Sequence, residues 1–150
     1  MTDRRQVWLP NFRNDEGACE CGCRAVPSDE LMTCVQALIY ALTRKYGNAV
    51  QCRITGGSRC PKHDDDVQAA VARAGGKPST DSQHRHNAAI DCTFWIRQQG
   101  GWAQISNDII AGVAIASGLF GGVGLNTYKR QGLNLVHLDV RHAGGTVATW

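Results

Sequence analysis

The chain has 150 residues, of which 43% are hydrophobic and 19% are charged, a composition typical of one globular domain and not of a disordered chain. The formal net charge of +3 is small and the basic residues are scattered, which argues against a nucleic-acid-binding protein. The N-terminus lacks the apolar run of a secretory signal peptide, and the most apolar stretch, 109–119, is too short to span a membrane. We therefore expect a protein made in the cytoplasm, without membrane insertion, that must be released if it acts outside.

Residues 1–27 show little periodicity, and glycines and prolines interrupt them. This pattern predicts an irregular N-terminal arm rather than a helix or a strand. We expect the arm to pack on the core through its large apolar side chains, Trp8, Leu9 and Phe12.

Three of the seven cysteines lie in this arm, as Cys19-Glu-Cys21-Gly-Cys23. An odd number rules out complete internal pairing, and the missing signal peptide disfavours a disulfide framework. The crowding suggests either a structural zinc site or reduced thiols in a loop. The Cys-x-Cys spacing is tighter than the usual two-residue gap, and no fourth ligand is evident nearby. The sequence leaves open whether these cysteines bind metal, pair or stay free.

The first half of the chain predicts two helices around a short strand. Ser28 is a good N-cap for a helix over 29–46, in which apolar residues recur at helical spacing. A strand at 49–54 and a helix over 63–74 follow. Residues 77–87 then form a polar loop.

The second half predicts mostly strands. Residues 89–96 resemble a buried strand, and further strands are expected at 133–141 and 146–150. A third helix is expected over 102–117, with core candidates Trp102, Ile105, Ile109, Val113 and Ile115. The order of elements predicts a single α+β domain over 1–150, with a small antiparallel sheet and flanking helices.

Four of the five histidines fall in two short segments, 82–91 and 135–142. The first segment contains His84 and Asp91, and imidazole and carboxylate are both good ligands for a borderline ion such as Zn²⁺. In the second segment, strand alternation places His137, Asp139 and Arg141 on one face. Burying three such groups is costly unless a metal and hydrogen bonds satisfy them. The two segments together predict a metal site.

Several motifs resemble those of the M15 family of zinc peptidases, which comprises D-Ala-D-Ala carboxypeptidases and related cell-wall endopeptidases, including phage endolysins. They occur in the family's order and cover about residues 11–142: Asn11-Phe12 with Cys19-x-Cys21-Gly22-Cys23, Ile54-Thr55-Gly56-Gly57-Ser58-Arg59-Cys60-Pro61-Lys62-His63, Ser82-x-His84-x-x-Asn87-x-Ala89-x-Asp91, Gly122-x-Gly124 with Tyr128, and Val136-His137-Leu138-Asp139-Val140-Arg141.

The resemblance implies that His84, Asp91 and His137 are the zinc ligands, which would leave a fourth position for water. It implies that Arg59 binds substrate oxygens and stabilises an oxyanion, and that Ser82 orients a group next to the metal. The implied fold is that of hedgehog and D-Ala-D-Ala peptidase domains. The implied activity is cleavage of peptidoglycan stem peptides at a bond involving a D-amino acid. A phage lysis or tail protein is the setting we expect, with other phage lysis or tail proteins as partners.

The sequence departs from the family pattern at three places. Asn87 replaces a glycine, but asparagine tolerates positive φ better than most residues. The loop before Arg59 lacks the family's tyrosine. Asn134 stands where many members have the general base, so Asp139 is the remaining candidate base.

A rival assignment takes His142 as the third ligand, because Asp139-x-x-His142 restores the acid-x-x-His spacing. We favour His137, since His142 would lie on the opposite face of the strand. The alternative function is a zinc-binding, non-catalytic structural or assembly module of the same fold.

Overall fold

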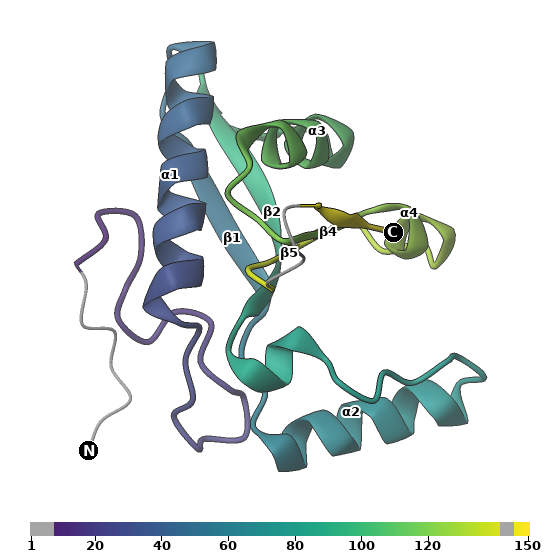
Figure 1. The fold of residues 1–150 in the computed structure, drawn as a ribbon. Coiled ribbons are helices and arrows are strands. Elements are labelled where there is room, and N and C mark those ends of the chain that lie inside the picture. Colours follow the sequence, from purple (N-terminus) through teal and green to yellow (C-terminus); the bar gives the residue numbers. More distant parts are fainter. Residues whose placement is uncertain (1–7, 142–145) are drawn as a thin grey trace.

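The computed structural model describes residues 8–141 and 146–150 and shows an α+β fold in which helices surround one mixed sheet (Figure 1). The elements, in chain order, are α1 (Asp29–Tyr46), β1 (Val50–Gly56), α2 (Pro61–Arg73), the 3₁₀ turn η1 (Gln83–His86), β2 (Ala89–Gln98), β3 (Gly101–Gln104), α3 (Asn107–Ser117), β4 (Gly122–Gly124), α4 (Asn126–Arg130), β5 (Val136–Asp139) and β6 (Ala148–Thr149). The predicted α+β class is confirmed.

The sheet has the strand order β1-β2-β5-β4-β6, and β3 pairs with the far end of β2. The pairs among β1 to β5 are antiparallel, as predicted, but β6 runs parallel to β4. The sheet is therefore mixed. The central position of β2 and β5 matters most for function, because these strands are far apart in sequence and adjacent in space.

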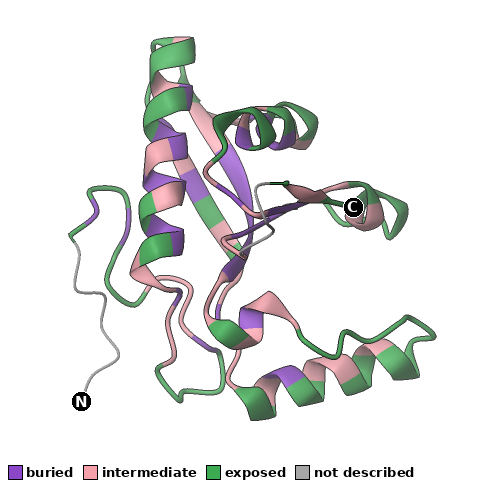
Figure 2. Ribbon diagram, viewed as in Figure 1, coloured by how far each residue is buried: buried purple, intermediate pink, exposed green. Residues whose placement is uncertain are grey.

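One face of the sheet is apolar and packs against α1 and α3. Strand β2 turns Ile90, Cys92 and Phe94 to this face, and β5 turns Val136 and Leu138 to it; all five are fully buried. The alternating residues of these two strands point to the opposite face, as strand geometry requires. Figure 2 shows the same division: α1 buries one side against the sheet, whereas α2 is largely exposed.

Helix α1 forms as the sequence predicts. The Ser28 side chain accepts a hydrogen bond from the Leu31 N–H and caps the helix, and Gly47 ends it in the left-handed conformation with φ +70°. The N-terminal arm packs through Leu9 and Phe12, as expected, but Trp8 is 80% exposed, so its predicted role in packing is wrong.

The helix predicted over 102–117 begins too early. Residues 101–104 form β3, because Gly100 and Gly101 adopt positive φ and turn the chain back into a hairpin with β2. The core face of α3 also differs from the prediction. Ile110, Ala111 and Ala114 are buried, whereas the expected core residues Ile109 and Ile115 are more than 40% exposed.

The sequence does not predict β4 or α4, which lie between α3 and β5. No helix in the described part of the chain has the length and apolar character needed to cross a membrane.

Candidate metal centre and cleft

The pairing of β2 with β5 brings Asp91 and His137 together. They are direct cross-strand neighbours, so their side chains leave the same face of the sheet. His137 Nδ1 lies 3.0 Å from Asp91 Oδ1, and both residues are buried. The predicted contact between the two segments, 46 residues apart, is therefore present.

The 3₁₀ turn before β2 supplies His84. The turn ends at Asn87, which adopts a left-handed φ of +57°, as expected where the family has glycine. His84 Nδ1 lies 2.8 Å from the Gly57 carbonyl oxygen. Because a carbonyl only accepts, Nδ1 carries the proton and Nε2 is left with its lone pair. Nε2 lies 3.3 Å from Asp91 Oδ2.

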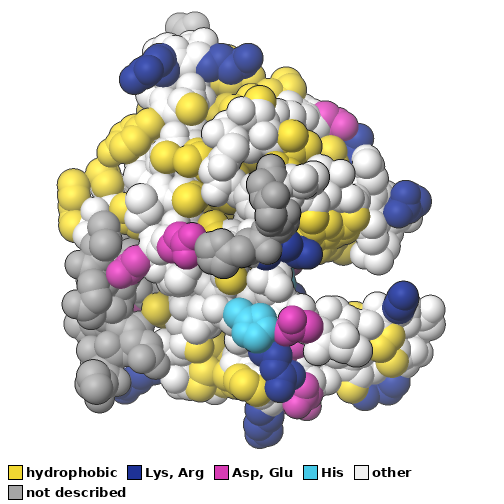
Figure 3. Space-filling model, in the orientation of Figure 1, with side chains coloured by type: hydrophobic (Ala, Val, Ile, Leu, Met, Phe, Trp, Pro, Cys, Tyr) yellow, Lys and Arg dark blue, Asp and Glu magenta, His cyan; other side chains and the backbone are white. Residues whose placement is uncertain are grey.

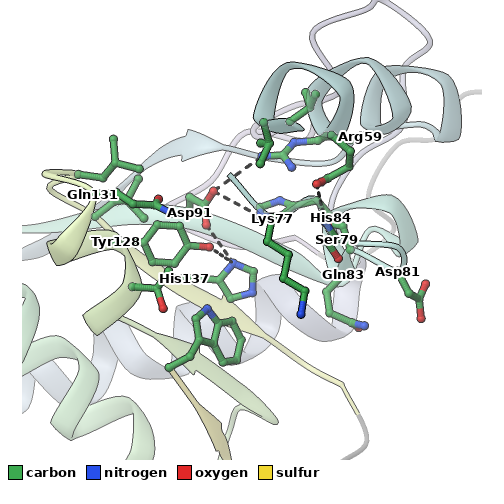
Figure 4. Close-up of a pocket in the computed structure, with 18 of the residues that line it drawn as sticks. Arg59, Lys77, Ser79, Asp81, Gln83, His84, Asp91, Tyr128, Gln131 and His137 are labelled. Atoms are coloured by element: carbon green, nitrogen blue, oxygen red, sulfur yellow. Dashed lines mark hydrogen bonds and ion pairs between the residues drawn. The ribbon is translucent and has the colours of Figure 1, made fainter. Parts of the chain in front are cut away.

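Each imidazole thus turns a nitrogen toward the same carboxylate, and the three donor atoms lie within 4.8 Å of one another (Figure 4). A neutral imidazole has only one N–H. His84 already donates to Gly57, so its contact with Asp91 is favourable only if the ring is protonated or a cation lies between the two groups. The negative charge of the buried Asp91 carboxylate needs a compensating positive charge. These three residues form a group that could bind a metal ion.

His137 is oriented from behind by Asp139. His137 Nε2 lies 3.0 Å from Asp139 Oδ2, which leaves Nδ1 to face Asp91. Asp139 is completely buried, and the Arg141 guanidinium contacts both of its carboxylate oxygens at 2.6–3.0 Å. A carboxylate that binds the far nitrogen of a histidine in this way commonly orients metal-binding histidines.

These contacts fix the charges of the group. Burial raises the pKa of Asp91, but hydrogen bonds with His137 and His84 outweigh it and hold that pKa well below its usual range. Burial likewise opposes ionisation of Asp139, yet His137 and Arg141 lower its pKa to about 2. For His137, burial lowers the pKa, while Asp139 and Asp91 raise it above the ordinary value. Both carboxylates are therefore ionised at neutral pH.

Arg59 lies beside this group, where the loop after β1 leads into α2. Its guanidinium is 3.5 Å from Asp64 Oδ1 and 3.9 Å from Asp91 Oδ2. Asp64 is only 2% exposed, so it holds the guanidinium from behind while one side of Arg59 faces the cleft. The sequence predicts the position of Arg59 but gives Asp64 no role beyond the first turn of a helix.

Two aromatic residues complete the surroundings of His137. The Tyr128 hydroxyl is 3.4 Å from His137 Nδ1, and burial together with the charge of Asp91 raises the pKa of Tyr128 to about 12. Trp150 lies with its ring centroid 5.1 Å from that of His137. Tyr128 belongs to the motif that resembles the M15 family. Nothing in the sequence around Trp150 indicates that it lies beside His137.

The group opens into a cleft of about 580 Å³ between α2 and the segment that contains α4. Figure 3 shows the molecule hollowed on the side where these parts face each other. Val67, Gln68 and Val71 line the α2 wall, and Lys77, Ser79 and Asp81 follow from the polar loop. The cleft is open and most of the residues that line it are polar or charged, which suits a peptide better than a small apolar ligand.

The remaining predicted site residues have different environments. Ser82 lines the cleft and precedes η1 but makes no side-chain capping hydrogen bond, and the Gly57 carbonyl takes the orienting role for His84. Asn134 lies away from the group, where it bonds to Gln104 and Asn107. His142 lies outside the described residues.

Asp139 was predicted to be the general base. Within the structure, its oxygens are occupied by His137 and Arg141 and it is absent from the cleft lining, so the geometry favours an orienting role. The carboxylates among the described lining residues are Asp81 and Asp91. Asp81 contacts the Nε2 atom of His86, an exposed histidine of the 3₁₀ turn η1.

A second group of possible metal ligands consists of Cys19, which is buried, and of Cys21, Cys23 and Cys60, which are exposed or partly exposed. The fourth cysteine comes from the N-cap of α2, 37 residues after Cys23, so the local sequence around the first three does not indicate it.

Comparison with known proteins gave no relatives: no protein-family model, no curated protein and no solved structure matches this chain.

Proposed function

We propose that the chain is a zinc-dependent peptidase that cleaves peptidoglycan stem peptides at a bond involving a D-amino acid, in the setting of phage lysis or a phage tail. One observation carries the proposal. His84, Asp91 and His137, the three ligands implied by the motif resemblance, come from three separate elements and turn their donor atoms to one point at the wall of an open cleft.

The donor set suits zinc. Two imidazole nitrogens and one carboxylate oxygen form a three-ligand site of the kind that catalytic zinc uses, with one position open. The hydrogen bonds to the Gly57 carbonyl and to Asp139 fix both ring orientations, as metal-binding histidines require. A bound zinc ion would supply a Lewis acid and lower the pKa of a coordinated water.

The chain's own residues would bind the substrate and stabilise charge. Arg59 is held by Asp64 in contact with Asp91, so its guanidinium can pair with a carbonyl oxygen that becomes negative during hydrolysis. Tyr128 stays protonated because its pKa is about 12, and its hydroxyl can donate a hydrogen bond beside His137. Arg59 and Lys77 line the cleft with positive charge, which favours a peptide bearing carboxylates.

The second candidate is a zinc-binding module without catalysis. It is favoured by the absence, among the described cleft residues, of a carboxylate placed as a general base. Asn134 is remote and Asp139 is enclosed. Both candidates predict zinc at the same three residues and differ only in turnover.

The test is the release of new amino groups from purified peptidoglycan by the zinc-loaded protein. We expect amine release that a chelator abolishes, that added zinc restores, and that His84→Ala lacks. His86→Ala is the matched control, because this loop histidine is exposed and bonded to Asp81. Full zinc loading with no amine release would favour the non-catalytic module.

A further inference from the structure

We propose that Cys19, Cys21, Cys23 and Cys60 bind a second, structural zinc ion that fastens the N-terminal arm to the start of α2. The four sulfur atoms lie within 4.8 Å of one another, and no residue of the cleft takes part in the group. The arm supplies three sulfurs from a five-residue segment, and the N-cap of α2 supplies the fourth.

The sulfur separations match a shared metal better than a disulfide. The Sγ atoms of Cys19 and Cys21 are 3.3 Å apart, and those of Cys21 and Cys60 are 3.4 Å apart. Tetrahedral zinc, with Zn–S bonds of about 2.3 Å, places its sulfur ligands roughly 3.8 Å apart. A disulfide needs about 2.05 Å, and all four residues are free cysteines.

Backbone N–H groups point at two of the four sulfurs and can stabilise negative charge there, as zinc-bound thiolates require. The Cys60 N–H points to Cys19 Sγ at 3.4 Å, and the His63 N–H points to Cys60 Sγ at 3.5 Å, at the positive end of α2. His63 Nδ1 lies 3.2 Å from Cys19 Sγ and can donate to it. His63 would therefore hydrogen-bond to a zinc ligand without being a ligand itself. Four sulfur ligands leave no open coordination position, which is the mark of a structural site.

The position of this cluster gives it a role in shaping the cleft. Cys60 directly follows Arg59 and closes the loop that begins at Gly56. The arm contacts the same loop, where the Ser58 N–H donates to the Gly17 carbonyl at 2.8 Å. A side chain at Gly57 would come within 1.9 Å of that carbonyl oxygen, so the two segments touch directly.

This loop in turn orients the cleft residues. The Gly57 carbonyl accepts from His84, and the Arg59 N–H donates to the His84 carbonyl at 3.0 Å. A metal that ties Cys60 to the arm would therefore hold the loop that positions both His84 and Arg59. This consequence for the cleft rests on the proposed function, whereas the cysteine site itself does not.

The experiment is elemental analysis and zinc X-ray absorption on protein purified without oxygen. We expect two zinc ions per chain. One should have four sulfur neighbours at about 2.3 Å and the other none, so the spectrum should show an average of two sulfurs per zinc. In His84→Ala we expect one zinc with four sulfurs. Cys21→Ser and Cys60→Ser should each remove the sulfur-bound zinc, whereas Cys34→Ser, a thiol on α1 outside the cluster, should retain it.

The wild-type absorption spectrum decides the matter even if the serine variants fail to fold. Zinc without sulfur neighbours in the wild type would overturn the proposal. So would a disulfide that joins any two of Cys19, Cys21, Cys23 and Cys60, detected by peptide mapping of the unfolded, chelated protein. Sulfur-bound zinc in a protein without peptidase activity would refute the proposed function and leave this inference standing.

Discussion

Asp139 and His137, two residues apart on one face of β5, are joined by a 3.0 Å contact between Asp139 Oδ2 and His137 Nε2. Asp139 is completely buried, and the Arg141 guanidinium donates hydrogen bonds to its carboxylate. This relationship directs the opposite nitrogen of His137 at Asp91. It makes Asp139 a positioning residue for a metal ligand, rather than a group that faces water in the cleft.

Asp139→Asn tests that role. We expect zinc affinity to fall by about 10–100-fold, because the carboxylate that orients the His137 imidazole is lost. The measurement is a competition titration with a chromogenic chelator. Asp108→Asn, which removes an exposed carboxylate paired with Lys129, should leave affinity unchanged. If Asp139→Asn instead binds zinc normally and loses all turnover, Asp139 is the general base that the sequence pattern predicts.

Gly122→Ala should disturb the same pair from the neighbouring strand. A Cβ at Gly122 would lie 2.4 Å from Asp139 Oδ2, and the buried carboxylate has no room to retreat. We expect a loss of about 1–3 kcal/mol in the free energy of unfolding, as for overpacked cores, together with weaker zinc binding. Denaturant unfolding measures the first effect.

Gly112→Ala is the control for this substitution. It lies within α3 and meets no atom within 4 Å, so alanine there should be neutral or stabilising by about 0.5–1 kcal/mol. Equal stability of the two alanine variants would contradict the packing argument for Gly122.

Arg59→Ala should lower turnover and spare the metal. Its guanidinium lies 3.9 Å from Asp91 but is not a ligand, so zinc content should stay at the wild-type level. Loss of a donor to a developing oxyanion costs about 10²–10³ in turnover. The comparison is with Arg53→Ala, an arginine that stacks on Trp95 away from the cleft and makes the same change in charge. A similar loss in both variants would point to a general effect of charge.

Zinc binding should weaken in acid because protons compete for His137. Asp139 and Asp91 raise the pKa of His137 above its ordinary value, against the effect of burial. Below that raised pKa the metal must displace a proton from the ring, so affinity falls as the pH falls, and it levels off above that pKa. Calorimetric titrations of the Cys21→Ser variant, which should lack the sulfur-bound zinc, in two buffers of different ionisation enthalpy count the protons released at the histidine site. Proton release at pH 5 no greater than at pH 9 would contradict this account.

The sequence predicts the metal group better than it predicts the cleft. His84, Asp91 and His137 could be found because histidines and acids in buried, strand-like segments need a reason to be there. Their convergence then follows from the pairing of β2 with β5, which places Asp91 opposite His137. The helix α1 is likewise predictable, since its cap and periodicity are local.

Features that depend on contacts between distant segments could not be predicted in this way. Trp150 approaches His137 only because β6 adds to β4 in parallel. Cys60 completes the cysteine cluster only because the arm folds back onto the start of α2. The wrong assignment of Trp102 to a helix has another cause. Gln99 and Gly100 form a hairpin turn between β2 and β3, but the apolar spacing that follows indicates a helix.

Mass spectrometry of peptidoglycan digested by the zinc-loaded protein tests the central claim most directly. The account predicts muropeptides with stem peptides cut at a single kind of bond involving a D-amino acid, and intact muropeptides when His84→Ala replaces the wild type. Intact muropeptides after digestion with fully zinc-loaded wild-type protein would contradict it.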